Sequence, residues 1–116
     1  MHTQTNMKFF SEAPKPVMVD ARLIECCGTR LEAIQLCIHL SKLSHEYICS
    51  RLGIDKGHWT RMMQGRAHFA ENKVETLMYL CGNYAPMQYE AFRMGFALVD
   101  PEAVAPKVDR RHLRRA

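Results

Sequence analysis

Apolar residues recur along most of this chain at the three-to-four-residue spacing of a helix that buries one face. Leu31, Ile34 and Ile38 follow this spacing in one stretch, and Val74, Leu77, Met78 and Cys81 follow it in another. Helix caps and glycines separate these stretches. The pattern therefore predicts an all-α fold with short helices at about residues 20–27, 29–42, 44–52, 55–64, 72–81 and 86–99.

Local signals place the ends of several of these helices. Thr29 stands three residues before Glu32, which is the spacing of a capping box. Asn72 is read in the same way as the cap of the helix that ends at Cys81. Residues 17–21 alternate like a short strand, whereas Leu23, Ile24 and Cys27 fit a helix, and we favour the helix from residue 20.

The most informative stretch runs from Ser44 to Arg66. Ser44 and Asp55 are N-caps of two short helices, and Gly53 supplies the left-handed residue at which the first helix ends. Cys49 is the small residue at which the second helix passes over the first. Trp59 is the large apolar residue that points back. This spacing predicts a helix-turn-helix.

The other side of the second helix is polar and basic. Three basic residues and no acidic residue lie between Lys56 and Arg66. Such a face suits a helix in the major groove of DNA, with base-reading residues near its start. The alternative is an ordinary helical hairpin with a solvated face.

The run Leu52-Gly53-Ile54-Asp55-x-x-x-Trp59-Thr60-Arg61-Met62-x-x-Gly65-Arg66 resembles the Cro/CI (XRE-like) helix-turn-helix family of phage repressors and bacterial regulators. The resemblance covers about residues 30–82, where that family places four helices and often adds a fifth, and it implies a compact five-helix bundle. A two-fold dimer, which is predicted below from the last helix, would match a palindromic operator. Trp59 is bulkier than the family's usual Ile or Val. Met63 and His45 stand where Glu and Gln are common, so the Gln that often contacts DNA is missing.

The predicted contacts with double-stranded DNA follow from this arrangement. Lys56 and Arg61 are expected to donate to guanine N7 and O6. Thr60 and His58 assist or contact phosphates, with an ordinary surface histidine as the alternative for His58, and Gly57 permits close approach. His45 and Arg66 are expected to hold phosphates. Lys42 is a further phosphate candidate, although its place at a helix end favours a role as partner of the helix dipole. Lys73 is either a phosphate contact or a solvated lysine.

The helix predicted for residues 86–99 has apolar residues on nearly every side, which requires cover on more than one side. We predict that one face packs on the domain and the other on a second copy of the chain. The expected dimer contacts are Tyr89, Phe92, Phe96 and Val99. The alternative is cover by the chain's own N-terminal segment.

Composition limits the remaining possibilities. The 116 residues suit one domain at residues 20–99, with a flexible arm at residues 1–19 and a basic tail at residues 100–116. Residues 107–116 hold five basic residues and one acidic residue, which equals the whole net charge of +4. Such a tail binds polyanions or only aids solubility.

The sequence shows no membrane span and no secretory leader, so we expect a cytoplasmic protein. It also shows no metal-ligand spacing, no phosphate-binding loop and no nucleophilic residue matched with a general base. We therefore expect a non-enzymatic protein without cofactor or small-molecule ligand. The sequence favours a phage- or prophage-type repressor. The competing hypothesis is an interaction protein, such as an antitoxin or an inhibitor of a host protein, that uses the helix-turn-helix scaffold to bind another protein.

Overall fold

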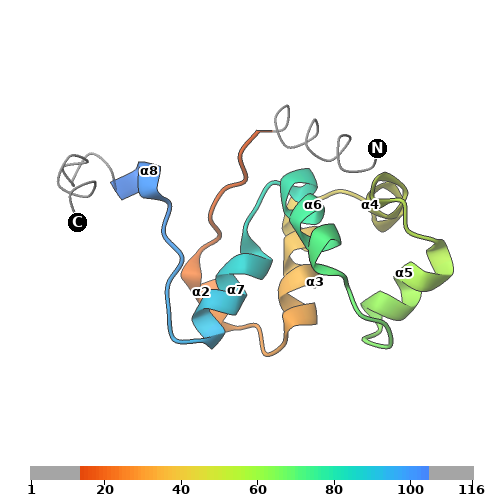
Figure 1. Ribbon diagram of the computed structural model, residues 1–116, viewed down its shortest axis with the longest axis horizontal. Helices are drawn as coiled ribbons and strands as arrows, with labels where there is room; N and C mark the ends of the chain where they lie inside the picture. Colours follow the sequence, from red (N-terminus) through yellow and green to blue (C-terminus); the bar gives the residue numbers. More distant parts are fainter. Residues whose placement is uncertain (1–13, 105–116) are drawn as a thin grey trace.

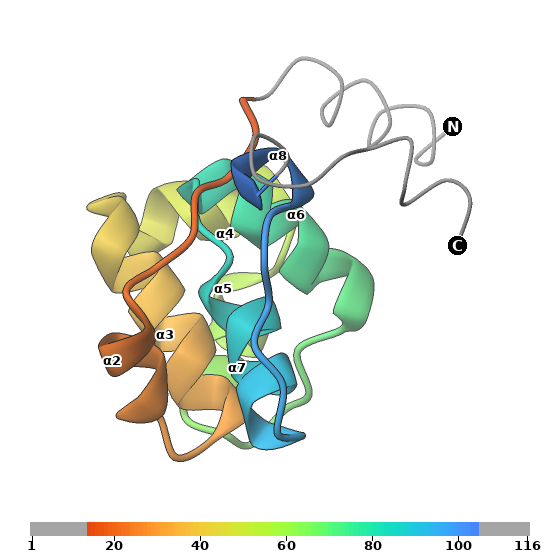
Figure 2. The same cartoon turned by 90° about the vertical axis from the view of Figure 1, so that its left-hand side faces the viewer.

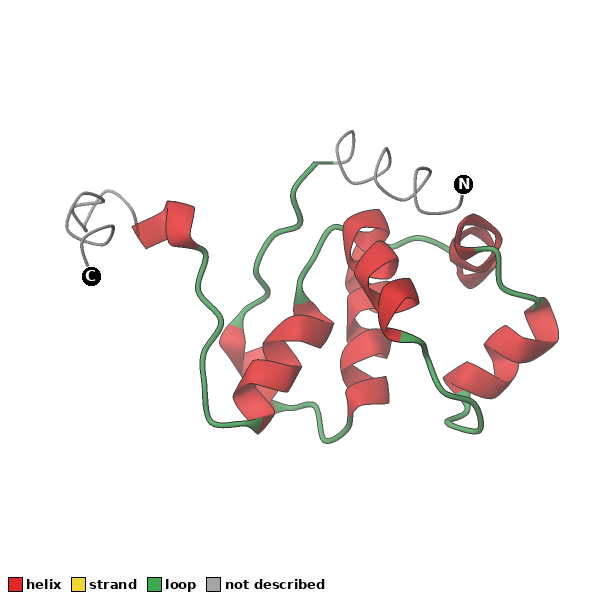
Figure 3. Cartoon of the chain, in the orientation of Figure 1, coloured by secondary structure: helices red, strands yellow, loops and turns green. Residues whose placement is uncertain are grey.

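The computed structural model describes residues 14–104, and every element named within them is a helix (Figure 1, Figure 3). The all-α prediction is therefore confirmed for this part of the chain. Most of the predicted flexible arm and basic tail, residues 1–13 and 105–116, lies outside it. The helices are α2 (Ala21–Glu25), α3 (Arg30–Ser41), α4 (His45–Leu52), α5 (Lys56–Met63), α6 (Glu71–Cys81), α7 (Ala85–Arg93) and α8 (Pro101–Val104).

Helix α3 forms the centre of the core. Ala33, Ile34, Cys37 and Ile38 are all buried on it. Helices α6 and α7 pack against α3, while α4 packs against α6 and α2 against α7. Helix α5 lies at the end of the molecule away from α8 (Figure 1). The core thus leaves the helix-turn-helix at one end, with the outer side of α5 uncovered.

Three of the predicted helix starts are confirmed by side-chain caps. Thr29 Oγ1, Ser44 Oγ and Asp55 Oδ2 accept hydrogen bonds from amides of the first turns of α3, α4 and α5. The return bond of the predicted capping box is displaced by one residue, because the Glu32 carboxylate accepts from the Gly28 amide instead of the cap residue.

The predicted start of α6 at Asn72 is wrong. The helix begins at Glu71, and Ala70 occupies the cap position without a side-chain hydrogen bond. Arg30 explains the shift, since its guanidinium donates to the Phe69 carbonyl at 2.9 Å and to the Glu71 carboxylate at 2.8 Å. These two bonds fix the chain entering α6 from the side of α3.

The prediction that the last helix runs to Val99 is also wrong. Helix α7 ends at Arg93, and Gly95 adopts a left-handed conformation with φ 88°. The Gly95 amide donates to the Phe92 carbonyl at 3.0 Å, and the Phe96 amide donates to the Ala91 carbonyl at 2.8 Å. This is a Schellman motif, and it satisfies carbonyls at the helix end. Residues 96–100 then run in extended form along the domain (Figure 2).

The described part of the predicted arm is bound to the domain. The Val17 amide donates to the Gly82 carbonyl, and the Tyr84 amide donates to the Val17 carbonyl, both at 3.0 Å. Gln88 holds Val19 by two further bonds, since its Oε1 accepts from the Val19 amide at 2.8 Å and its Nε2 donates to the Val19 carbonyl at 2.9 Å. Val19 belongs to the core.

One side of α7 is therefore covered within the chain, which was the alternative to a second copy. Tyr89 is buried in the core, so its prediction as a dimer contact is wrong for this reason. By contrast, Phe92, Phe96 and Val99 are exposed.

In the described residues, no helix is long and apolar enough to cross a membrane.

Candidate nucleic-acid interface

The turn between α4 and α5 has the geometry that the sequence predicts. Gly53 is left-handed, with φ 68°, and the Ile54 amide donates to the Cys49 carbonyl at 3.0 Å. Cys49 and Leu52 are buried on α4, and Ile54 packs at the edge of the core. This turn sets the direction in which α5 leaves α4.

Trp59 fastens α5 to its neighbours. Its indole is only 5% exposed and meets the Phe69 ring edge-on, with centroids 5.9 Å apart. The His45 ring lies 5.8 Å away on another side, and the indole Nε1–H donates to His45 Nδ1 at 3.2 Å. Together with buried Met62, Trp59 orients the whole helix. The bulk that departs from the family pattern therefore serves packing.

The opposite side of α5 is open to solvent. Lys56, Gly57, Thr60 and Arg61 are exposed, while His58 is partly covered. Lys56 lies 4.0 Å from the Glu46 carboxylate, but both side chains are at least 80% exposed, so this ion pair contributes little. Within residues 14–104, Arg61 has no ion pair. Two cations thus project from one helix face with little to restrain them.

Gly57 has a role within the protein that the sequence did not suggest. A Cβ at this position would lie 3.2 Å from Asp55 Oδ2, which accepts hydrogen bonds from the Gly57 and His58 amides. A side chain would therefore crowd the cap of α5. The glycine keeps the start of the helix tight as well as leaving its outer surface flat.

The other predicted contact residues divide into available and engaged groups. His45 uses Nδ1 to accept from Trp59, so a neutral ring carries its proton on Nε2, where it can donate to a phosphate. Lys42 is exposed just after α3, in a left-handed conformation with φ 61°. Lys73 is engaged, because its ammonium donates to the Leu52 carbonyl at 2.7 Å and so caps α4.

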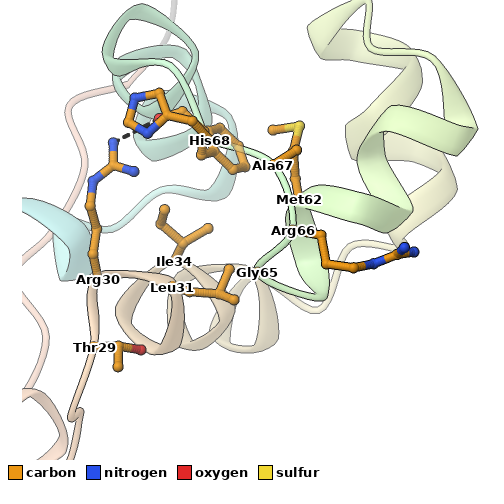
Figure 4. A pocket seen from close by; sticks show the side chains of 10 residues that line it. Thr29, Arg30, Leu31, Ile34, Met62, Gly65, Arg66, Ala67 and His68 are labelled. Atoms are coloured by element: carbon orange, nitrogen blue, oxygen red, sulfur yellow. Dashed lines mark hydrogen bonds between the residues drawn. The ribbon is translucent and has the colours of Figure 1, made fainter.

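Arg66 lies beside a cavity of about 390 Å³ between α3 and the α5–α6 loop (Figure 4). Its guanidinium points away from the cavity and is held by the Gln64 side chain at 2.8 Å. Arg30 instead crosses one end of the cavity to the Phe69 carbonyl. Arg66 is thus directed outward, whereas Arg30 supports the fold.

A second concavity, of about 550 Å³, lies between α3, the α3–α4 loop and the end of α5. It brings Lys42 and His45 together with His39 and Gln35, and Gln35 also donates to the Met63 carbonyl at 3.0 Å. Sequence reasoning missed Gln35 and His39 as neighbours of the candidate interface. Only the tertiary fold brings the end of α3 beside α5, so no local signal could have indicated them.

Charge is unevenly distributed over the described residues. Residues 42–66 hold five basic and two acidic residues, whereas residues 67–104 hold two basic and five acidic residues. The part that contains α4 and α5 is therefore basic, and the part that contains α6, α7 and α8 is acidic. This asymmetry favours approach of a polyanion from the helix-turn-helix side.

Buried Cys37 and partly buried Cys81 lie close enough for their side chains to interact. A hydrogen bond with the Cys81 side chain, with burial, raises the pKa of the Cys37 thiol well above its usual value. The same hydrogen bond lowers the pKa of Cys81. In residues 14–104, no cluster of three or more His, Cys, Asp or Glu side chains could hold a metal ion.

No family model matches the chain, and no curated protein or solved structure matches it either. The likeness to the Cro/CI family therefore rests on residues 52–66 and remains a prediction.

Proposed function

We propose that this chain is a sequence-specific regulator of transcription that binds double-stranded DNA through α5, as a phage- or prophage-type repressor does. One observation carries the proposal. Lys56, Thr60 and Arg61 lie exposed on one side of α5, while Trp59 and Met62 on the other side hold the helix in place. A rigid helix with a free cationic face is what reading the major groove requires.

The residues have separate roles in this proposal. Lys56 and Arg61 reach base edges, where a guanidinium can donate two hydrogen bonds to guanine. His45, Arg66 and Lys42 contact phosphates and so set the position of α5 along the duplex. Lys73 is left out of this set because it already caps α4.

A dimer forms the second part of the proposal. Phe92, Phe96 and Val99 are 44%, 72% and 65% exposed, and Met94 between them is 67% exposed. Exposed apolar side chains of this size mark interaction surfaces. Two copies joined across this surface would present two α5 helices to the two halves of a palindromic site.

Arg61→Ala is the direct test. The variant should lose about 1–3 kcal/mol of affinity for its preferred duplex, roughly 5- to 150-fold, and should lose selectivity at one base pair. Arg22→Ala is the matched control, because Arg22 is an exposed arginine on α2 that pairs with Asp20 and lies outside the proposed DNA and dimer surfaces. Fluorescence anisotropy with labelled duplexes measures both. An equal loss on every duplex would make Arg61 a phosphate contact, and no loss would overturn the role of α5.

The alternative, an interaction protein such as an antitoxin or an inhibitor of a host protein, is favoured by one observation. Residues 14–104 hold ten basic and ten acidic residues, so the described domain has no net charge to attract DNA, while its apolar surface around Phe96 is open. Salt separates the two functions. Binding to DNA weakens steeply as salt rises, whereas apolar binding to a protein changes little.

A further inference from the structure

A groove runs along the outer side of α6. It consists of two adjoining cavities of about 260 Å³ and 460 Å³ that share Glu75, Met78 and Met87. The smaller cavity lies beside residues 98–101, and the larger one lies between α6 and α7. We refer to the combined cavity as the α6 groove. It belongs to a different part of the molecule from α5 (Figure 1).

The α6 groove has an apolar floor and an acidic rim. Val74, Met78 and Pro86 form the floor of the larger cavity, and its rim carries Glu71, Glu75 and Glu90. Two cations also line the groove: Arg30 pairs with Glu71, and Lys15 pairs with Asp100 in the smaller cavity. Glu90 pairs with Arg93. Among the described residues, Glu75 has no ion-pair partner. Such a lining suits an occupant that combines cations with apolar side chains.

We propose that the occupant is the basic tail of the same chain, residues 107–116. The charges are complementary, since the tail has a net charge of +4 and residues 67–104 have a net charge of −3, from two basic and five acidic residues. The composition also fits, because Val108 and Leu113 are interspersed among Lys107, Arg110, Arg111, Arg114 and Arg115. Arginine pairs with carboxylates and lays its aliphatic stem on apolar surface.

The position at which the chain leaves the described domain makes this docking possible. Asp100 and Pro101 line the smaller cavity, so α8 begins at the edge of the α6 groove. Twelve extended residues span about 40 Å, whereas the eleven residues of α6 span about 16 Å. The tail after residue 104 is long enough to follow the groove from end to end.

Docking of the tail has a consequence that rests on the proposed function. A tail held on the α6 groove is not available to DNA, so duplex DNA competes with Glu75 and its neighbours for the same arginines. The groove then reduces binding to arbitrary sequences, because the tail adds affinity without reading bases. Sequence selection by α5 is left intact.

Nuclear magnetic resonance of the full ¹⁵N-labelled chain, without DNA, tests the docking itself. Glu75→Lys should move the amide signals of residues 107–116, while Glu25→Lys, which makes the same charge change at an exposed site on α2, should leave them in place. Raising salt from about 50 mM to about 500 mM should abolish the difference, because exposed charges are then screened. Tail signals that ignore Glu75→Lys overturn the proposal.

If Glu75→Lys unfolds the chain, a second variant tests the same docking from the side of the tail. The fourfold variant Arg110→Gln, Arg111→Gln, Arg114→Gln and Arg115→Gln should shift the amide signals of residues 71–78 and 86–90. The amide signals of α5 should stay unchanged. Shifts that depend on protein concentration indicate the tail of another copy and overturn docking within one chain. Because neither measurement contains DNA, failure here leaves the proposed function untouched, and failure of DNA binding leaves the docking result untouched.

Discussion

Replacing Trp59 is expected to separate the packing of the helix-turn-helix from the chemistry of its surface. Trp59 is the only tryptophan of the chain, and its ring contacts His45 of α4 and Phe69 of the loop before α6. Trp59→Ala removes all of these contacts and the indole hydrogen bond at once. Trp59→Phe keeps an aromatic ring but loses the bond to His45 Nδ1.

The size of the effect follows from burial. With 5% of its surface exposed, Trp59 is a core residue, and truncating a buried Trp or Phe to Ala costs about 3–5 kcal/mol. That is a large share of the roughly 5–15 kcal/mol by which a native domain is stable. Trp59→Phe should cost about 1–2 kcal/mol, from one hydrogen bond and a small loss of volume.

Urea unfolding followed by far-ultraviolet circular dichroism is the suitable assay, because tryptophan fluorescence disappears with the residue. At a slope of about 2 kcal/mol per molar urea, Trp59→Ala should lower the midpoint by about 2 M. Tyr47→Ala on α4 is the control, since Tyr47 is 47% exposed and its loss should cost about 0.5 kcal/mol or less. A cost below about 1 kcal/mol for Trp59→Ala would refute the role given to this residue.

Three further predictions concern the rest of the domain. Gln88→Met, which leaves two buried backbone groups of Val19 without partners, should destabilise the fold by about 2–4 kcal/mol. The control Gln64→Met, at an exposed site, should cost under about 0.5 kcal/mol. A similar cost for both variants would contradict the role of Gln88 in holding Val19. Gly95→Ala should cost about 1–2 kcal/mol in the same assay, because only the left-handed backbone opposes the methyl group, and an unchanged midpoint would argue against this helix end. Buried Cys37 should resist iodoacetamide in the native chain, because its raised pKa keeps it a thiol at neutral pH, whereas exposed Cys26 should react. Peptide mass spectrometry measures both alkylation rates. Equal rates would show that Cys37 is accessible.

The sequence predicted those features that depend on residues close together in the chain. Ser44 and Asp55 cap their helices as expected, and Gly53 adopts the left-handed turn, because each signal acts within three or four residues. The burial of Trp59 and Met62 follows equally from spacing along one helix. These features position the candidate site, which explains why the face that carries Lys56 and Arg61 could be predicted.

Features that depend on residues far apart in the chain could not be predicted from local sequence signals. Gln88 holds Val19 across 69 positions, so nothing near residue 19 indicated that the described part of the arm is docked. Lys73 similarly reaches back 21 positions to cap α4. At the end of α7, the apolar run suggested a longer helix, but the Schellman motif at Gly95 outweighs the helical pattern that continues beyond it.

Selection of bound sequences from random duplex DNA, with the full chain shown to be folded, is the decisive test of base reading by α5. We expect an enriched palindromic motif with guanine at the positions that Lys56 and Arg61 reach. Selection with Arg61→Ala should relax one position in each half-site and preserve the rest. A folded chain that enriches no sequence at all would contradict the claim that α5 reads DNA.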